Sequence, residues 1–274
     1  MKMRLIVIIS VSISMWACNP KQKDEKNAMD LLEQVKNEIS QKNHSNARQL
    51  IDSLHATYPT MVAIRKQAAA QLDTMLLRES HKTVAFGNEY LPRMKSEIER
   101  LKQNFRFEIN KKYESIGKYV YKTQHNEQNT AFTHLKVTVD EHGNLYLSSF
   151  YRGVKLNHHD IELQAGSLTT ATNNKQTKNA VFHSFKDGDT TVEILTFKNE
   201  ADNNLSDFIR ANKNSVIRVK LMADKNTTYT LSESNKKAIS SAVELSKAIK
   251  LYRQTEREFI QAQERIGKIK LLYQ

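Results

Sequence analysis

The chain has 274 residues, of which 42 are Lys or Arg and 30 are Asp or Glu, so its formal net charge is +12. It contains one cysteine and 7 glycines. A single thiol excludes an intramolecular disulfide, so the chain must fold on hydrophobic burial alone, and it is long enough for one large or two modest domains. The low glycine count disfavours loops in which the backbone must closely approach a cofactor.

The first 18 residues have the layout of an export signal. Two basic residues precede an apolar run over 5–16, which is shorter than the ~20 residues that a membrane-spanning helix needs. The run ends in Met15-Trp16-Ala17-Cys18, which resembles the lipobox of bacterial lipoproteins. This resemblance implies that residues 1–17 are a removable signal peptide and that Cys18 carries covalent lipid. No other cofactor is expected.

Residues 18–27 are polar and offer nothing that could pack, so they are expected to form a solvated tether. Within it, Lys23-Asp24-Glu25 resembles the lysine-then-two-acids export signal of Bacteroidota-type surface lipoproteins. The resemblance implies a protein that is lipid-anchored in the outer membrane and displayed at the cell surface. The alternative location is the periplasmic face. In either case, the membrane is a partner through the N-terminal lipid.

Apolar residues at helical spacing predict a helical region over 28–115. Two short amphipathic helices come first, and Tyr58-Pro59 closes the second. The segment 43–72 resembles a tetratricopeptide-type helical pair, with Ala47 at the helix crossing. About one and a half units are visible where such a solenoid needs ~3, so a plain helical hairpin packed on its neighbours is the alternative.

Two longer helices are predicted, one on each side of the central region. The first carries an apolar seam at alternating steps of three and four residues, formed by Leu91, Met94, Ile98, Leu101 and Phe105. The second, over 233–274, carries a similar seam. A narrow apolar stripe on a charged helix must be buried, so the two helices are expected to pair antiparallel like a coiled coil. The alternative is pairing between two chains, which leaves the oligomeric state open.

Between these helices, the period of the apolar residues changes from 3.6 to 2, as over 131–139, which predicts a β-domain over 116–232. Hairpin turns are expected at 140–144 and 186–189, and a short helix at 205–209. About eight short strands fit into the region. The predicted fold class is α+β, with helical hairpins and long antiparallel helices that flank an inserted antiparallel β-sandwich or barrel.

The sequence contains few reactive constellations. His158-His159-Asp160 is the strongest metal-ligand candidate, but adjacent residues of an extended strand point to opposite faces, so no metal site is expected. A hydrolase that acts on envelope glycan or peptide would need paired carboxylates. The candidate carboxylates are Glu141, Asp160, Glu162 and Glu193.

Two surface features complete the sequence-based picture. Asp189-Thr190-Thr191 resembles the short O-glycosylation signal of exported Bacteroidota proteins, which makes Thr190 a glycosylation candidate. Six aromatic residues of the β-domain are expected to fill its core rather than to form a carbohydrate platform: Tyr146, Phe150, Tyr151, Phe182, Phe185 and Phe197.

These observations predict a non-enzymatic, lipid-anchored envelope protein whose β-domain has a binding or an assembly role. The basic excess can attract anionic glycans, and an envelope protein is the other expected partner. Lysine is spread along the helices and no aromatic-basic groove is visible, so no nucleic-acid partner is expected. The alternative function is the envelope hydrolase described above.

Overall fold

The computed structural model describes residues 20–124, 132–198 and 201–273, so the predicted signal peptide and Cys18 lie outside the described residues. The chain divides into two compact units, each described separately below. The first unit comprises the chain up to Thr83 together with Ala262–Gln274, and the second comprises Val84–Gln261. Within the described ranges, no helix combines the length and the apolar character needed to cross a membrane.

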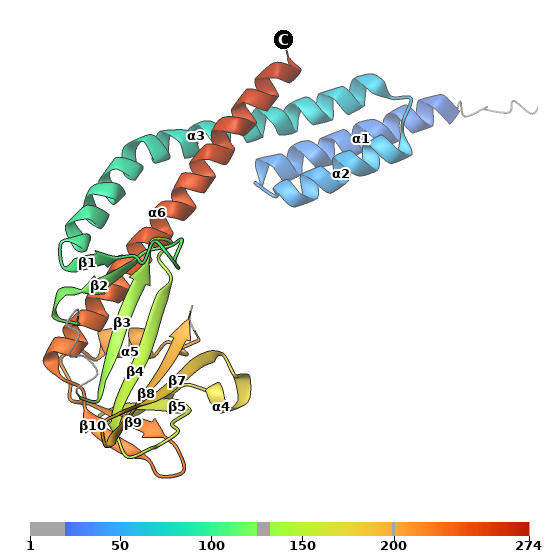
Figure 1. Cartoon of the computed structure of the whole chain (residues 1–274). Helices are drawn as coiled ribbons and strands as arrows, with labels where there is room; N and C mark the ends of the chain where they lie inside the picture. The colour runs from blue at the N-terminus through green and yellow to red at the C-terminus, as the bar shows by residue number, and fades with distance from the viewer. Residues whose placement is uncertain (1–19, 125–131, 199–200, 274) are drawn as a thin grey trace, which may run out of the picture. The chain divides into compact units, whose positions relative to one another are not determined.

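The first unit is helical (Figure 1). Helices α1 (Pro20–Ser40) and α2 (His44–Thr57) form a hairpin, and the first part of α3 (Val62–Lys102) and the end of α6 (Glu233–Leu272) complete the unit. Its core is formed by Ala28, Leu32, Val35, Ala47, Ile51, Leu54, Ile64, Ala68, Leu72, Leu76 and Ile269. Ala47 is fully buried in this core.

The structure corrects the expected tether, because α1 begins at Pro20 and includes the segment up to residue 27. Proline suits the first position of a helix, where its missing amide costs no hydrogen bond, and the Lys, Gln and Glu residues that follow are good helix formers. A polar, charged sequence therefore continues the amphipathic helix in the N-terminal direction, although it buries almost nothing itself.

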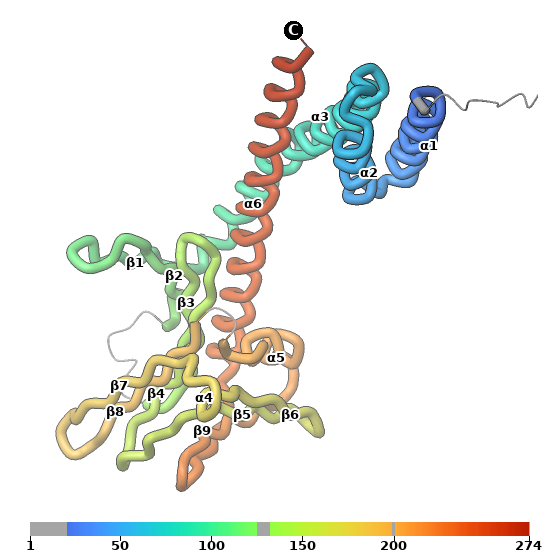
Figure 2. The backbone as a smooth tube through the Cα atoms, turned by 90° about the vertical axis from the view of Figure 1, so that its right-hand side faces the viewer, coloured from blue at the N-terminus to red at the C-terminus, as the bar shows by residue number. Residues whose placement is uncertain are grey.

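The second unit contains two antiparallel sheets (Figures 1 and 2). The strand order is β1-β2-β3-β4-β8-β7 in the sheet that we call Sheet A, and β10-β9-β5-β6 in Sheet B. The strands are β1 (Phe105–Glu108), β2 (Lys118–Tyr121), β3 (His134–Asp140), β4 (Leu145–Gly153), β5 (Asp160–Ala165), β6 (Leu168–Ala171), β7 (Ala180–Asp187), β8 (Thr190–Lys198), β9 (Ile217–Met222) and β10 (Thr227–Thr230). Short helices occur at η1 (Lys122–Gln124), α4 (Asn174–Thr177) and α5 (Leu205–Ala211).

The α+β class is confirmed, and so are the two predicted turns and the short helix α5. The end of the first helical seam was predicted wrongly, because α3 ends at Lys102 and Phe105 begins β1. The ring of Phe105 lies edge-on against Tyr121 of β2, with centroids 5.3 Å apart. The helical spacing of apolar residues continues through Phe105, but packing against the next strand makes this residue part of a strand. The sandwich or barrel arrangement of the sheets remains a prediction.

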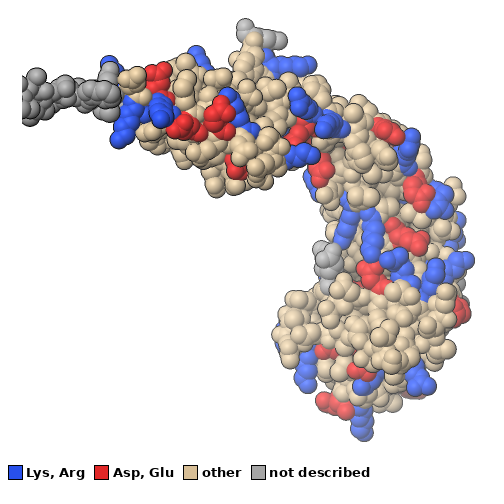
Figure 3. Space-filling model, turned by 180° about the vertical axis from the view of Figure 1, so that it is seen from behind, with Lys and Arg blue, Asp and Glu red and all other residues tan. Residues whose placement is uncertain are grey.

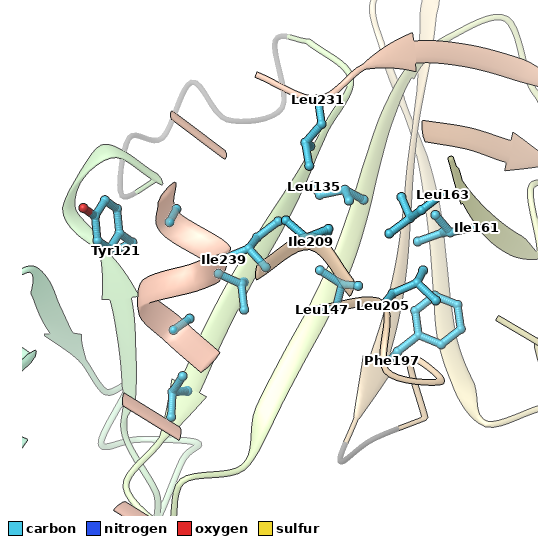
Figure 4. Packing of buried hydrophobic residues seen from close by; sticks show 14 of the residues in the cluster. Tyr121, Leu135, Leu147, Ile161, Leu163, Phe197, Leu205, Ile209, Leu231 and Ile239 are labelled. Carbon is cyan, nitrogen blue, oxygen red and sulfur yellow. The ribbon is translucent and has the colours of Figure 1, made fainter. Parts of the chain in front are cut away.

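One core joins both sheets to the helices of the second unit (Figure 4). Sheet A contributes residues such as Leu135, Leu147 and Phe197, all at most 1% exposed, and Sheet B contributes Ile161 and Leu163. Helices α5 and α6 cover this core with Leu205, Ile209, Ile239, Ala242 and Leu245. The alternating strand pattern therefore buries one face of each sheet, as the sequence predicted.

The expected coiled-coil pairing of the long helices is not confirmed. In the second unit, α3 and α6 approach each other closely where buried Gly87 meets Phe259. Leu91 and Met94 of the predicted seam stay only partly buried, whereas Ile98 and Leu101 join the core of the β-domain. At Gly87 the two helices leave no room for a larger side chain.

Replacing Gly87 with alanine tests this contact. An added Cβ would lie 2.3 Å from Cδ2 and 2.9 Å from Cγ of Phe259, so the ring must move. We expect Gly87→Ala to lower the free energy of unfolding by about 1–3 kcal/mol, although alanine is the better helix former. Urea unfolding of the variant measures this change.

Gly267→Ala is the matched control, because Gly267 also lies in a long helix and an added Cβ there meets no atom within 4 Å. This control should raise the free energy of unfolding by up to about 1 kcal/mol. Equal stability of the two variants would contradict the proposed contact.

Candidate functional site

Three polar side chains meet in the interior of the second unit. Ser149 lies on β4, Glu193 lies on β8, and His158 precedes β5. Ser149 Oγ lies 2.5 Å from His158 Nε2, and His158 Nδ1 lies 2.9 Å from Glu193 Oε2. The exposed fractions of Ser149, His158 and Glu193 are 0%, 1% and 0%. The arrangement has the connectivity of a serine–histidine–acid triad.

Strand alternation places two of these residues in the core. Ser149 of β4 faces Leu135 on one neighbouring strand and Leu195 on the other, in the middle of the buried face of Sheet A. Glu193 is two residues before Leu195 and therefore points to the same face. His158 completes the cluster from the segment before Sheet B, and it lies edge-on to Phe182, with ring centroids 6.0 Å apart.

Hydrogen bonds to the backbone hold the Glu193 carboxylate in place. Its Oε1 accepts from the amides of Leu156 at 2.7 Å and Asn157 at 2.8 Å, and its Oε2 accepts from the amide of His158 at 3.2 Å. Burial by itself raises the pKa of Glu193, but the bonds from these amides and from the His158 side chain outweigh burial and keep that pKa below its ordinary value. The carboxylate is therefore ionised.

The pKa of His158 is lowered, mainly because burial disfavours the charged imidazole, and the nearby Glu193 only partly opposes this effect. A neutral ring has one donor nitrogen and one acceptor nitrogen. The hydrogen bonds assign the donor to Nδ1, which faces the carboxylate, and the acceptor to Nε2, which faces the hydroxyl of Ser149. This is the tautomer that a catalytic triad would use.

The cluster nevertheless lacks access to a substrate. Ser149 has no exposed surface and lies in the middle of a strand that is paired on both sides. A nucleophile must reach the reacting atom of its substrate, so the present arrangement cannot act on one. The cluster has a structural role, because its hydrogen bonds connect the interior of Sheet A to the segment that begins Sheet B.

The predicted metal candidates do not converge. His158 points into the buried cluster, whereas His159 Nδ1 lies 3.0 Å from Asp160 Oδ2. Asp160 also accepts from Thr172 Oγ1 at 2.6 Å and from the amide of Lys175 at 3.0 Å, at the start of α4. In the part of the chain that the structure describes, no group of three His, Cys, Asp or Glu side chains could hold a metal ion.

The remaining predicted site residues are not members of this cluster. Lys23, Asp24 and Glu25 are exposed in the first turns of α1, and Cys18 lies outside the described residues. The Thr190 hydroxyl donates to the Asp187 carbonyl at 2.9 Å, next to the β7–β8 turn.

Glu141 and Glu162 lie at separate places. Glu162 of β5 pairs with Lys220 of β9 at 3.3 Å. Glu141 borders a cavity of about 200 Å³ between α3, α6 and the β3–β4 turn. The cavity is lined by Lys95, Ile98, Glu99, Lys102, Tyr119, Glu141, Ile249, Tyr252, Arg253 and Glu256.

The glutamates of this charged cavity have local partners. Glu141 Oε2 accepts from the Gly117 amide at 2.8 Å, and Glu99 pairs with Lys102 at 2.9 Å. The Tyr252 hydroxyl donates to Glu256 Oε1 at 2.9 Å. Positive and negative groups therefore balance one another at the cavity wall.

The sequence reasoning found His158 and Glu193 separately but missed Ser149 and the cluster itself. In each of two strands, the alternation of side chains predicts an apolar residue at a position that a polar residue occupies. This mismatch was the available signal in the sequence. A buried polar side chain needs a partner, so Ser149 and Glu193 should have been matched with a histidine. The chain matches no protein-family model, no curated protein and no solved structure.

We expect Glu193→Gln to lower the free energy of unfolding by about 2–4 kcal/mol, because it removes a buried charge from its histidine and amide partners. Glu162→Gln is the control. It breaks a partly exposed pair and should cost less than about 1 kcal/mol. Urea unfolding at neutral pH compares the two variants. Equal losses in the free energy of unfolding would show that the buried cluster stabilises the fold no more than the partly exposed pair does.

Proposed function

We propose that this chain is a lipid-anchored, non-enzymatic protein of the bacterial envelope, whose β-domain binds another protein. The observation that carries the proposal is the sealed state of Ser149, His158 and Glu193, since the side chains with the connectivity for catalysis are instead used to hold the fold together. The anchor is the lipid on Cys18. Exposed Lys23-Asp24-Glu25 serves as the export signal that directs the protein to the cell surface.

A second feature supports binding over catalysis. A row of cross-strand neighbours, formed by His134, Phe150, Ile194 and His183, lies on the face of Sheet A opposite the core. We call it the outer row. The rings of His134 and Phe150 stack with centroids 5.0 Å apart, and Phe132, which is 57% exposed, packs on His134. His134 is only 3% exposed and Phe150 and Ile194 are half-buried, so Phe132 provides the exposed apolar surface at this end of the row. Exposed apolar surface on a sheet is typical of an interaction site.

The composition of the outer row favours a protein partner over an anionic glycan. A glycan of that kind would need clustered cations, whereas the row holds no Lys or Arg and consists of two histidines, one phenylalanine and one isoleucine. On the face shown in Figure 3, Lys and Arg side chains are interspersed with Asp and Glu. Mixed charge of this type usually solvates a surface and gives little preference for an anion.

Changing Cys18 to alanine tests the anchor. Without the thiol no acyl chain can be attached, so we expect the protein to leave the membrane fraction, either as a soluble form or as an uncleaved precursor. Membrane fractionation and immunoblotting of cells that produce the variant measure this change. A variant that stays firmly bound to the membrane would refute the lipoprotein assignment.

Alanine at Lys23, Asp24 and Glu25 is the matched control, because it leaves Cys18 and its lipid in place. The protein should then remain in the membrane fraction but lose its sensitivity to protease added to intact cells. Unchanged sensitivity would show that these residues do not determine the surface location.

An envelope hydrolase remains the second candidate function, because Glu99, Glu141 and Glu256 line one charged cavity. Paired carboxylates at a cavity are what glycoside hydrolysis requires. We expect the purified chain to release no product from peptidoglycan or from envelope polysaccharide. Activity that Glu141→Gln abolishes, and that Glu162→Gln retains, would replace the binding proposal with the hydrolase.

A further inference from the structure

Strand β7 is an unusual edge strand. The other three edges of the two sheets are β1, β6 and β10, each of which has 4 residues, whereas β7 has 8. Native proteins keep edges short or covered because a row of unpaired backbone groups binds other strands. In Figure 2 the β7–β8 hairpin reaches outward, and its turn lies far from α5.

Large apolar side chains are exposed on both faces of this strand. Val181, Phe182 and Phe185 are 38%, 40% and 48% exposed. Phe182 is on the core side, opposite Leu195, whereas Val181 and Phe185 are on the same side as the outer row. A solvated edge needs none of these residues, so their presence points to a partner that covers the strand.

The hairpin geometry shows which backbone groups face outward. The two-residue turn Gly188-Asp189 makes Asp187 and Thr190 the closing hydrogen-bonded pair. Bonds to β8 then alternate along the strand, so the amides and carbonyls of Phe182, Ser184 and Lys186 point away from β8. Among the described residues, no strand pairs with this side of β7.

We propose that β7 pairs antiparallel with β7 of a second copy of this chain, about a two-fold axis that passes at His183. The charge pattern of the strand supports self-pairing. Lys186 and Asp187 lie at one end, and Ala180 and Val181 lie at the other. Antiparallel pairing brings each charged end beside the apolar end of the other copy and keeps like charges apart, as an isologous interface requires.

The side chains select the position of the axis. A two-fold axis perpendicular to the sheet leaves each side chain on its own face, so two facing residues must point to the same face. Side chains alternate between the faces along the strand, so the axis must pass beside a residue and not between two residues. With the axis at His183, Val181 faces Phe185 of the second copy twice, at non-hydrogen-bonded positions where side chains come closest. An axis at Ser184 would instead place Val181 opposite Asp187 and Phe185 opposite His183, so both Val181–Phe185 contacts would be lost.

The dimer does not depend on the lipid anchor and goes beyond the proposed function. It joins two copies of Sheet A into one continuous sheet and covers both exposed edges. A single pair of strands buries less than a standard interface of about 1,600 Å², so we expect a dissociation constant in the micromolar range.

Sedimentation equilibrium of the chain from residue 18 onward, with Cys18→Ser, tests the dimer. We expect reversible dimers between about 1 and about 100 µM. Ser184→Pro removes an amide that faces the second copy but not one that bonds β8, so it should weaken the dimer at least tenfold. The control Ser184→Ala keeps the amide and should dimerise like the parent chain. A parent chain that is monomeric throughout this range, or a Ser184→Pro variant that dimerises normally, overturns the proposal.

Disulfide trapping gives a second test that does not require the proline variant to fold. Facing non-hydrogen-bonded residues have Cα atoms ~4.5 Å apart, within the reach of a disulfide. His183→Cys, in the chain without Cys18, should therefore form a covalent dimer on mild oxidation. Ser184→Cys is the control, because its facing residue would be Phe182, and it should cross-link much more slowly. Faster trapping at Ser184→Cys overturns the axis at His183, and no trapping at either position overturns the pairing.

Discussion

The second unit depends on one constraint, namely a carboxylate held in the hydrophobic core. An ionised Glu193 without partners would be strongly unfavourable there, so three backbone amides and His158 must surround it. Meeting this requirement fixes the segment from Leu156 to His158, including Asn157 with its positive φ of 54°. That segment leads directly into β5, so the polar cluster determines where the chain leaves Sheet A and begins Sheet B.

The same use of acids recurs at the turns of the β-domain. Asp140 accepts from the amides of His142 and Asn144, both at 2.8 Å, and thereby closes the β3–β4 hairpin. Burial raises the pKa of Asp140, but these hydrogen bonds outweigh it and lower the pKa overall. Asp160 organises the start of α4 in the same way. Carboxylates whose residue type and position would suit catalysis are here acceptors for otherwise unsatisfied backbone donors.

Features set by local chemistry were predictable from the sequence. The strands of the β-domain, its two hairpin turns and α5 follow from side-chain alternation and from turn residues such as Gly143 and Gly188, which have positive φ. Features set by distant partners were not predictable. Phe105 becomes a strand residue because Tyr121 is beside it, and the long helices meet at Gly87 because Phe259 fills the space that a side chain would need. Ser149 was missed for the same reason, since its partners come from another strand and from a segment nine residues away.

The proposed binding surface and the proposed dimer are geometrically linked. The outer row passes from His134 through Phe150 and Ile194 to His183, and His183 is the residue at which the two-fold axis would pass. Two copies would therefore join their outer rows end to end into one band, with Phe132 at each extremity. Such a band has two equivalent halves, so a partner with two like segments would gain affinity from engaging both without any new type of contact. A monomer would offer only half of this band beside an unprotected strand edge, so the dimer would explain why Val181 and Phe185 of β7 are exposed next to the outer row.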